Sequence, residues 1–242
     1  MLILKPFCLI CLFSVSYFLS AETLKLGVGQ DLPPYVLSDS NSGIELDIAR
    51  EALLIKGHKI TPVYLPFGRV MLALESGDVD AALTVNEDSG IAGIHYSNAH
   101  ITYQNVAIAL KQQGFKINSI SSLTDYSVLA FQYASLYLGS EFETMTNQNP
   151  NYSEKGQQNI QVSMLYLKRV QVVIMDLAIF KYFKKLESRV NTGAAIDVFK
   201  IFPPTPYKVG FRNVKFKKDF DIGLSDLKMS GRYDEIIKKY VD

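Results

Sequence analysis

The sequence predicts an α/β protein of two lobes, because strand-like and helix-like segments alternate along nearly the whole chain. Apolar runs mark strands covered on both faces, and the segments between them carry apolar residues at helical spacing. The alternation changes near Tyr103, where a strand-like segment has no long helix before it, and again at Pro203-Pro204. Two α/β units divided at two such points predict two lobes joined by two extended linkers.

The first unit has a regular succession of elements. We expect strand Leu24–Val28, helix Ile44–Lys56, strand Ile60–Leu65, helix Val70–Glu75 and strand Val79–Val85. Pro33-Pro34 excludes a helix from the loop after the first strand. Ser42 stands three residues before Glu45, which is the spacing of a capping box at the start of the first helix.

The second unit repeats the alternation and is followed by a closing segment. We expect strands Tyr103–Leu110, Ser127–Phe131, Val172–Met175 and Ile196–Phe202, and helices Ala134–Thr146, Gln161–Arg169 and Leu177–Glu187. The polar stretch Asn147–Asn159, with Pro150 and Gly156, predicts an exposed loop. A strand at Tyr207–Arg212 and two helices complete the chain. If this strand returns to the first unit, the two linkers form a hinge that bends while keeping the lobes together.

The N-terminus predicts a secretory signal peptide over residues 1–21. Lys5 precedes the apolar run Phe7–Leu19, and the small residues Ser20-Ala21 follow it. The run is shorter than the roughly 20 residues that span a bilayer comfortably. An uncleaved anchor is the alternative. With no later transmembrane pattern, we expect a soluble protein outside the cytoplasm, in the periplasm.

Composition excludes several classes of function. The chain has 242 residues and a formal net charge of +1, which gives no electrostatic footprint for nucleic acid. Cys8 and Cys11 both lie in the predicted signal peptide, so the mature chain has no disulfide or thiol chemistry. The three His residues are too scattered for a metal site, and no nucleophile motif or phosphate-binding loop is present. We therefore expect no metal, no cofactor and no catalytic residue.

Six segments in order resemble the extracellular solute-binding proteins of family 3, which include periplasmic amino-acid receptors of ABC importers. The segments are Leu26–Leu37, Gly43–Leu53, Leu65–Leu83, Val172–Lys185, Tyr207–Asn213 and Ser230–Tyr240. The resemblance implies a type II periplasmic-binding-protein fold, with residues 22–102 plus 208–242 in lobe one and 103–207 in lobe two. It also implies a monomer that captures a small polar solute in the cleft and delivers it to a membrane permease or a sensor.

The resemblance places ligand contacts on both lobes. Phe67 matches the aromatic residue that packs on the ligand, although it could equally belong to the core. Asp176 follows a buried strand and matches the acid that takes the ligand's ammonium, while its alternative role is to cap the next helix. The turn from Gln132 to Ser135 matches backbone N–H groups offered to an anionic group. The candidate ligand-binding residues are Asp31, Tyr35, Phe67, Arg69, Thr84, Asn86, Glu87, Gln132, Ser135 and Asp176.

One departure from the family bears on the ligand. The carboxylate-binding arginine would fall near Ser89, but the segment Thr84–Tyr96 contains no Lys or Arg and carries Glu87 and Asp88 instead. A standard α-amino acid would lose its main carboxylate partner in a closed cleft. A cationic or neutral polar ligand is one interpretation; the others are that the two acids belong to a solvated loop, or that Arg69 supplies the missing charge.

A second class of function stays open at this stage. Some relatives of the family are periplasmic dehydratases, and such an enzyme needs a positioned acid or base in the cleft. Glu87 and Asp176 are the candidates for that role. The missing arginine argues against an acidic substrate, so we expect a binding protein rather than an enzyme.

Overall fold

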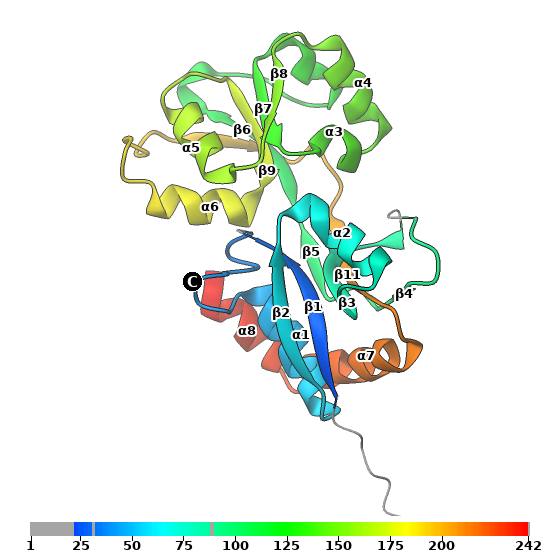
Figure 1. Cartoon of the computed structure of the whole chain (residues 1–242). Coiled ribbons are helices and arrows are strands. Elements are labelled where there is room, and N and C mark those ends of the chain that lie inside the picture. The colour runs from blue at the N-terminus through cyan, green and yellow to red at the C-terminus, as the bar shows by residue number, and fades with distance from the viewer. Residues whose placement is uncertain (1–21, 31, 88–89, 242) are drawn as a thin grey trace, which may run out of the picture.

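The computed structural model describes residues 22–30, 32–87 and 90–241, and it has two lobes, each built on one β-sheet (Figure 1). The predicted signal peptide, Asp31 and Asp88 lie outside the described residues. Two crossings of the chain connect the lobes, one entering the second sheet at Asn105 and one returning to the first at Thr205. The predicted two-lobed type II fold is confirmed.

The first lobe combines parallel and antiparallel strands in one sheet. Its strands are β1 (Thr23–Gly29), β2 (Lys59–Leu65), β3 (Ala81–Val85), β4 (His95–Tyr96), β5 (Ile101–Tyr103) and β11 (Thr205–Phe211). The order is β2-β1-β3-β11-β4, and β5 pairs with β11. β1 lies parallel to β2 and β3, whereas β11 runs antiparallel to its neighbours. The late strand β11 therefore returns to the lobe in which the described chain begins.

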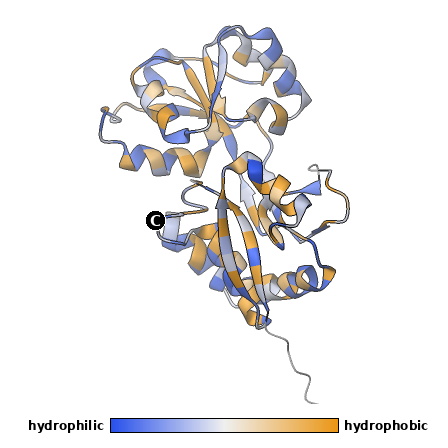
Figure 2. Cartoon of the chain, viewed as in Figure 1, coloured by the Kyte–Doolittle hydropathy of each residue, from blue (hydrophilic) through white to orange (hydrophobic). Residues whose placement is uncertain are grey.

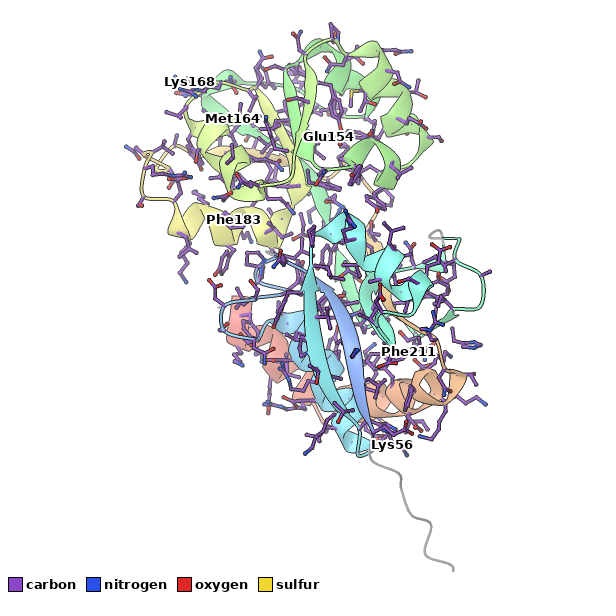
Figure 3. The ribbon with its side chains drawn as sticks, viewed as in Figure 1. Lys56, Glu154, Met164, Lys168, Phe183 and Phe211 are labelled. Carbon is purple, nitrogen blue, oxygen red and sulfur yellow. The ribbon has the colours of Figure 1, made fainter. Side chains whose placement is uncertain are left out.

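Helices cover this sheet and complete its core. They are α1 (Ile44–Ile55), α2 (Phe67–Ser76), α7 (Val214–Met229) and α8 (Arg232–Val241). Helix α1 packs on α7 so closely that a Cβ at Gly223 would lie 2.0 Å from the Ala52 carbonyl oxygen. Phe211 of β11 and Phe220 of α7 are fully buried, with ring centroids 5.5 Å apart (Figure 3). The two C-terminal helices thus belong to the core of the first lobe.

The second lobe holds a five-stranded sheet in the order β10-β6-β9-β7-β8. Its elements are β6 (Asn105–Leu110), β7 (Val128–Phe131), α3 (Ala134–Tyr137), α4 (Ser140–Gln148), β8 (Tyr152–Lys155), α5 (Gln158–Tyr166), β9 (Val172–Asp176), α6 (Leu177–Leu186) and β10 (Ile196–Phe199). The strands β6 and β9 are buried at every residue, and Figure 2 shows hydrophobic colour concentrated at the centre of this lobe. Figure 1 shows α6 along the edge that faces the first lobe.

Most predicted elements are confirmed with shifted ends, and four details differ. The predicted strand Tyr103–Leu110 divides at Gln104 between β5 of the first sheet and β6 of the second. The predicted helix Ala134–Thr146 is two helices, because Gly139 adopts a φ of 89° between them. The predicted loop Asn147–Asn159 contains the edge strand β8. The predicted capping box is wrong, since α1 has Gly43 at its N-cap with no side-chain capping bond, and Glu45 turns into the protein.

The hinge linkers are tied together by Gln104. Its Nε2 donates to the carbonyl oxygens of Asn105 and Phe202, each at 3.0 Å. Since the two carbonyls lie on the two chain crossings, one side chain joins both linkers. Among the described residues, no helix is long and apolar enough to cross a membrane.

Candidate functional site

A cavity of about 710 Å³ lies between the lobes and is lined by residues of both. The first lobe contributes the loop after β1, the start of α2 at Phe67, and Thr84 at the end of β3. The second lobe contributes Phe131 and Gln132 after β7, Asp176 at the end of β9, and the inward side of α6. Ligand cavities of small molecules usually occupy about 300–1,000 Å³, so this cavity has the size of a small-molecule site.

Asp176 lies where the sequence predicts it, at the carboxyl end of β9, and it is 3% exposed. Its Oδ1 accepts hydrogen bonds from the N–H groups of Ala178 and Ile179, which caps α6, and from the Tyr35 hydroxyl at 3.1 Å. Its Oδ2 accepts from Gln104 N at 2.8 Å. Burial raises the pKa of the Asp176 carboxyl, although these hydrogen bonds act to lower it. Asp176 therefore caps a helix and also lines the cavity, as both interpretations of the sequence allowed.

Aromatic rings form much of the cavity wall. Tyr35 stacks on Tyr103 with ring centroids 3.9 Å apart, and Tyr103 meets Tyr207 edge to face at 4.9 Å. Phe67 of the first lobe meets Tyr137 of the second edge to face at 5.7 Å. Figure 3 labels Phe183 on α6, at the side of the second lobe that faces the first. Because the rings come from both lobes and from a hinge linker, movement of the lobes changes how the rings enclose the cavity.

The lobes also contact each other beside the cavity. Gly68 lies so close to Tyr133 that a Cβ at the glycine would be 3.0 Å from the tyrosine ring. The Tyr35–Asp176 hydrogen bond crosses between the lobes as well. A glycine at position 68 thus permits the approach of the second lobe.

Behind Thr84, a buried network fixes the wall of the first lobe. Glu45 is fully buried and accepts four hydrogen bonds: Oε1 from Thr84 N and His100 Nε2, and Oε2 from Thr84 Oγ1 and the Tyr103 hydroxyl. The distances are 2.9, 2.9, 2.9 and 3.0 Å. Thr84 has a φ of 59°, which is unfavourable for a β-branched residue. The Glu45 carboxylate compensates by holding both donors of Thr84.

Sequence reasoning missed the role of Glu45, although its signal was present. An acid three residues after Ser42 fitted a capping box, but it also stood among the apolar residues of an amphipathic helix. An unpaired carboxylate is costly to bury, so burial required partners that lie far away in the sequence. Those partners, His100 and Tyr103, come from the segment that leads into the hinge.

The turn after β7 is engaged by a carboxylate of the protein itself. Glu154 of β8 accepts hydrogen bonds from the N–H groups of Tyr133 and Ser135, at 2.6 and 3.0 Å, and from Ser135 Oγ at 2.8 Å. The Tyr152 hydroxyl adds a fourth at 2.7 Å. Burial acts to raise the pKa of the Glu154 carboxyl, but the hydrogen bonds from these residues together outweigh it, and the pKa is lowered. Figure 3 labels Glu154 in the second lobe. The donors that the sequence assigned to an anionic ligand are thus occupied.

The predicted ligand-binding residues that the structure describes divide into those that line the cavity and those that do not. Phe67, Thr84, Gln132 and Asp176 line the cavity, and Tyr35 bonds to Asp176. Exposed Arg69 lies in a separate surface depression beside Leu72 and Glu75. Glu87 is 59% exposed and pairs with Lys208. Hydrogen bonding to Lys208 lowers the pKa of Glu87. Asn86 and Ser135 are not among the described lining residues.

The charged side chains in the described cavity lining are all acidic. This lining includes the acids Asp39 and Asp176 but no Lys, Arg or His. Asp31, Asp88 and Ser89, which the structure does not describe, are not basic either. Within the described part of the chain, no group of His, Cys, Asp and Glu could hold a metal ion.

Two α/β lobes, two linkers and an interlobe cavity define the class of hinged solute-binding proteins. A model of the bacterial extracellular solute-binding proteins, family 3, matches residues 24–242. The chain belongs to this family. A search of curated proteins found no match.

Solved structures agree with the fold. An ancestral arginine-binding protein bound to arginine has 22% identity and a TM-score of 0.72, covering 91% of this chain and 98% of that one. A histidine kinase sensor domain with similarity to periplasmic binding proteins has 16% identity and a TM-score of 0.76, covering 90% and 96%. An ancestral amino acid-binding protein, a precursor of cyclohexadienyl dehydratase, has 20% identity and a TM-score of 0.70, covering 91% and 96%. At these identities the likeness concerns the fold.

Proposed function

We propose that this protein captures a small polar solute in the interlobe cavity by hinged closure. The observation that carries the proposal is the cavity of about 710 Å³, whose wall combines Phe67 and Thr84 of one lobe with Gln132 and Asp176 of the other. A solute that touches both walls binds the closed arrangement better than the open one, and this difference in affinity drives closure. Tyr35, which bonds to Asp176 across the lobes, belongs to the same group of contacts.

The proposed setting is the periplasm, reached through a signal peptide at residues 1–21. We propose that residues 22–102 plus 208–242 form lobe one and residues 103–207 form lobe two, except that Tyr103 and Thr205–Tyr207 pair within the first sheet. The protein acts as a monomer and delivers the solute to an ABC-type permease or to a sensor protein. The similar fold of a histidine kinase sensor domain supports delivery to a sensor as an alternative to delivery to a permease.

The solute differs from a standard α-amino acid held by an arginine. The described cavity lining has no basic side chain, and the backbone N–H groups of Tyr133 and Ser135 donate to Glu154. The alternative of a dehydratase-like enzyme has less support, because Glu87 pairs with Lys208 away from the cavity lining and does not join Asp176. Of the two acid–base candidates named from the sequence, only Asp176 lines the cavity.

Thermal unfolding and solution X-ray scattering test solute capture. We expect a binding solute to raise the melting temperature and to reduce the radius of gyration, because it stabilises the folded and closed state. The panel should contain amino acids, amines, sugars and organic acids. If none of them changes either quantity, capture of a common small metabolite is wrong. Turnover of a bound cyclic acid would instead favour the enzyme.

A further inference from the structure

The side chains of the cavity wall limit the charge that a bound solute can carry. An inference about that charge rests on the capture function proposed above. A carboxylate in a closed cavity needs a positive side chain or several free N–H donors, because burying an unpaired charge is costly. The described lining of this cavity offers no positive side chain, and its remaining donors are neutral, among them the backbone N–H groups of residues 156–159 at the start of α5. This lining lacks Lys, Arg and His, and Glu154 already accepts from the N–H groups of Tyr133 and Ser135.

The nearby basic side chains do not alter this charge balance. Lys208 pairs with Glu87, and both residues lie outside the cavity lining. Arg69 is an exposed residue of α2 and lines a different depression. A solute carboxylate would therefore face Asp39 and Asp176 without a compensating cation from the wall.

Aromatic faces are the second feature of the wall. A cation within about 6 Å of an aromatic ring centroid is attracted to the negative face of the ring, and more strongly when water is excluded. Phe67, Tyr103, Tyr137 and Tyr207 line the cavity and contact one another in pairs. Burial, followed by the charges of Glu45, Tyr137 and Asp176, raises the pKa of Tyr207, so its ring stays neutral at physiological pH.

The two oxygens of Asp176 differ in the donors that they accept. Oδ1 accepts from Tyr35, Ala178 and Ile179, whereas Oδ2 accepts only from Gln104 N among the described residues. Each oxygen of an ionised carboxylate has about two acceptor positions, so Oδ2, which has one donor, can take a further one. Because Asp176 lines the cavity, that donor can come from a solute.

We propose that the solute is an organic ammonium ion without a carboxylate, enclosed by Phe67, Tyr103, Tyr137 and Tyr207 and balanced by Asp176. A primary ammonium would donate to Asp176 Oδ2, whereas a quaternary ammonium would rely on the rings and on the carboxylate charge. Both forms share the same requirement for an aromatic wall with a buried negative charge.

Matched pairs of solutes, which differ in whether they carry a carboxylate, measure the effect of that group on binding. Calorimetry on the purified protein should compare agmatine with arginine, tyramine with tyrosine, and choline with glycine betaine. We expect the member without a carboxylate to bind at least about tenfold more tightly in the pair that fits the cavity, because the other member buries an uncompensated charge. Tighter binding of the carboxylate-bearing member would overturn the proposal. The agmatine and choline arms distinguish a primary from a quaternary ammonium.

Variants assign the binding to the proposed groups. Asp176→Asn should weaken the preferred cation at least about tenfold, whereas Asp125→Asn, an exposed site in the same lobe, should leave the affinity unchanged. An affinity within twofold of the parent for Asp176→Asn would contradict the proposal. Because Asp176 also caps α6, Phe67→Leu provides a second measurement that removes the ring and keeps an apolar side chain. It should weaken cations about 3- to 30-fold, the range of one cation–π contact, and spare the neutral choline analogue 3,3-dimethylbutan-1-ol. An equal loss for both would remove the cation–π argument.

Failure of this inference is distinguishable from failure of solute capture. If a sugar, an organic acid or a zwitterion compacts the protein while the cations do not, capture stands and the cation proposal is wrong. If no solute changes the melting temperature or the scattering profile, capture itself is wrong and the cation proposal falls with it.

Discussion

Glu45 in the first lobe and Asp176 in the second are both buried carboxylates, yet the two lobes hold them differently. Glu45 accepts two hydrogen bonds on each oxygen, all from side chains and backbone of the first lobe or of the hinge. Asp176 has three donors on Oδ1 and one on Oδ2, and it lines the cavity. Both carboxylates accept four hydrogen bonds, so what separates the one that supports the wall from the one that can meet a solute is its place in the cavity lining, together with the single donor on Asp176 Oδ2.

Among variants of these carboxylates, the largest expected effect is the loss of folding stability when Glu45 is replaced. Glu45→Gln should lower the free energy of unfolding by about 3–5 kcal/mol, because removing one partner of a buried ionic network leaves the others unsatisfied. Its amide would also direct a second donor toward Tyr103 or His100. Urea denaturation measures the loss. Glu51→Gln, on the same helix but in a partly exposed pair with Arg232, should cost only a small fraction of it. Equal losses of stability in the two variants would show that the Glu45 network stabilises the fold no more than a surface ion pair does.

Glu154 gives the second lobe a carboxylate that also accepts four hydrogen bonds, three on Oε1 and one on Oε2. Glu154→Gln should lower the free energy of unfolding by about 1.5–3 kcal/mol, the size of one hydrogen bond to a charged group, since its remaining oxygen can still accept. Glu143→Gln, an exposed site on α4, is the matched control. The same variant should narrow the preference for agmatine over arginine, because it removes a negative charge from the turn. A wider preference would show that Glu154 does not repel carboxylates.

The contrast between these acids explains what could be predicted from the sequence. The strands, most helices and Asp176 were predictable, because apolar periodicity and the end of a buried strand are local signals. The strand β8 was missed because Tyr-Ser-Glu-Lys has an edge-strand pattern with only partly buried alternate residues. Apart from the Tyr152 hydroxyl, the donors to Glu45 and Glu154 lie 19 to 58 residues away, and local patterns do not contain such contacts. The same holds for the pairing of Glu87 with Lys208, 121 residues apart.

Ionisation of Asp176 should change folding stability and cation affinity in opposite directions as the pH rises. Its pKa is raised by burial, so its contribution to stability is present in acid and is lost as the pH rises through the folded pKa. Binding of a cation needs the ionised form, so affinity should increase over that same rise, by about tenfold for each pKa unit between free and bound protein. Calorimetry and urea denaturation of the parent and Asp176→Asn across this range measure both trends. Affinity that falls on ionisation would mean that the solute is not a cation at Asp176.

The smallest effect belongs to Glu87, the acid that the sequence placed near the ligand. Its carboxylate is mostly exposed and pairs with Lys208, so Glu87→Gln should lower the free energy of unfolding by about 1 kcal/mol or less. Solute affinity should change less than about twofold, because screening by water weakens a charge outside the cavity. Calorimetry with the preferred solute of the parent protein checks this, and Asp125→Asn serves as the control for a lost surface charge. A tenfold loss of affinity would place Glu87 at the solute in the closed state and would give the first lobe a ligand-facing carboxylate of its own.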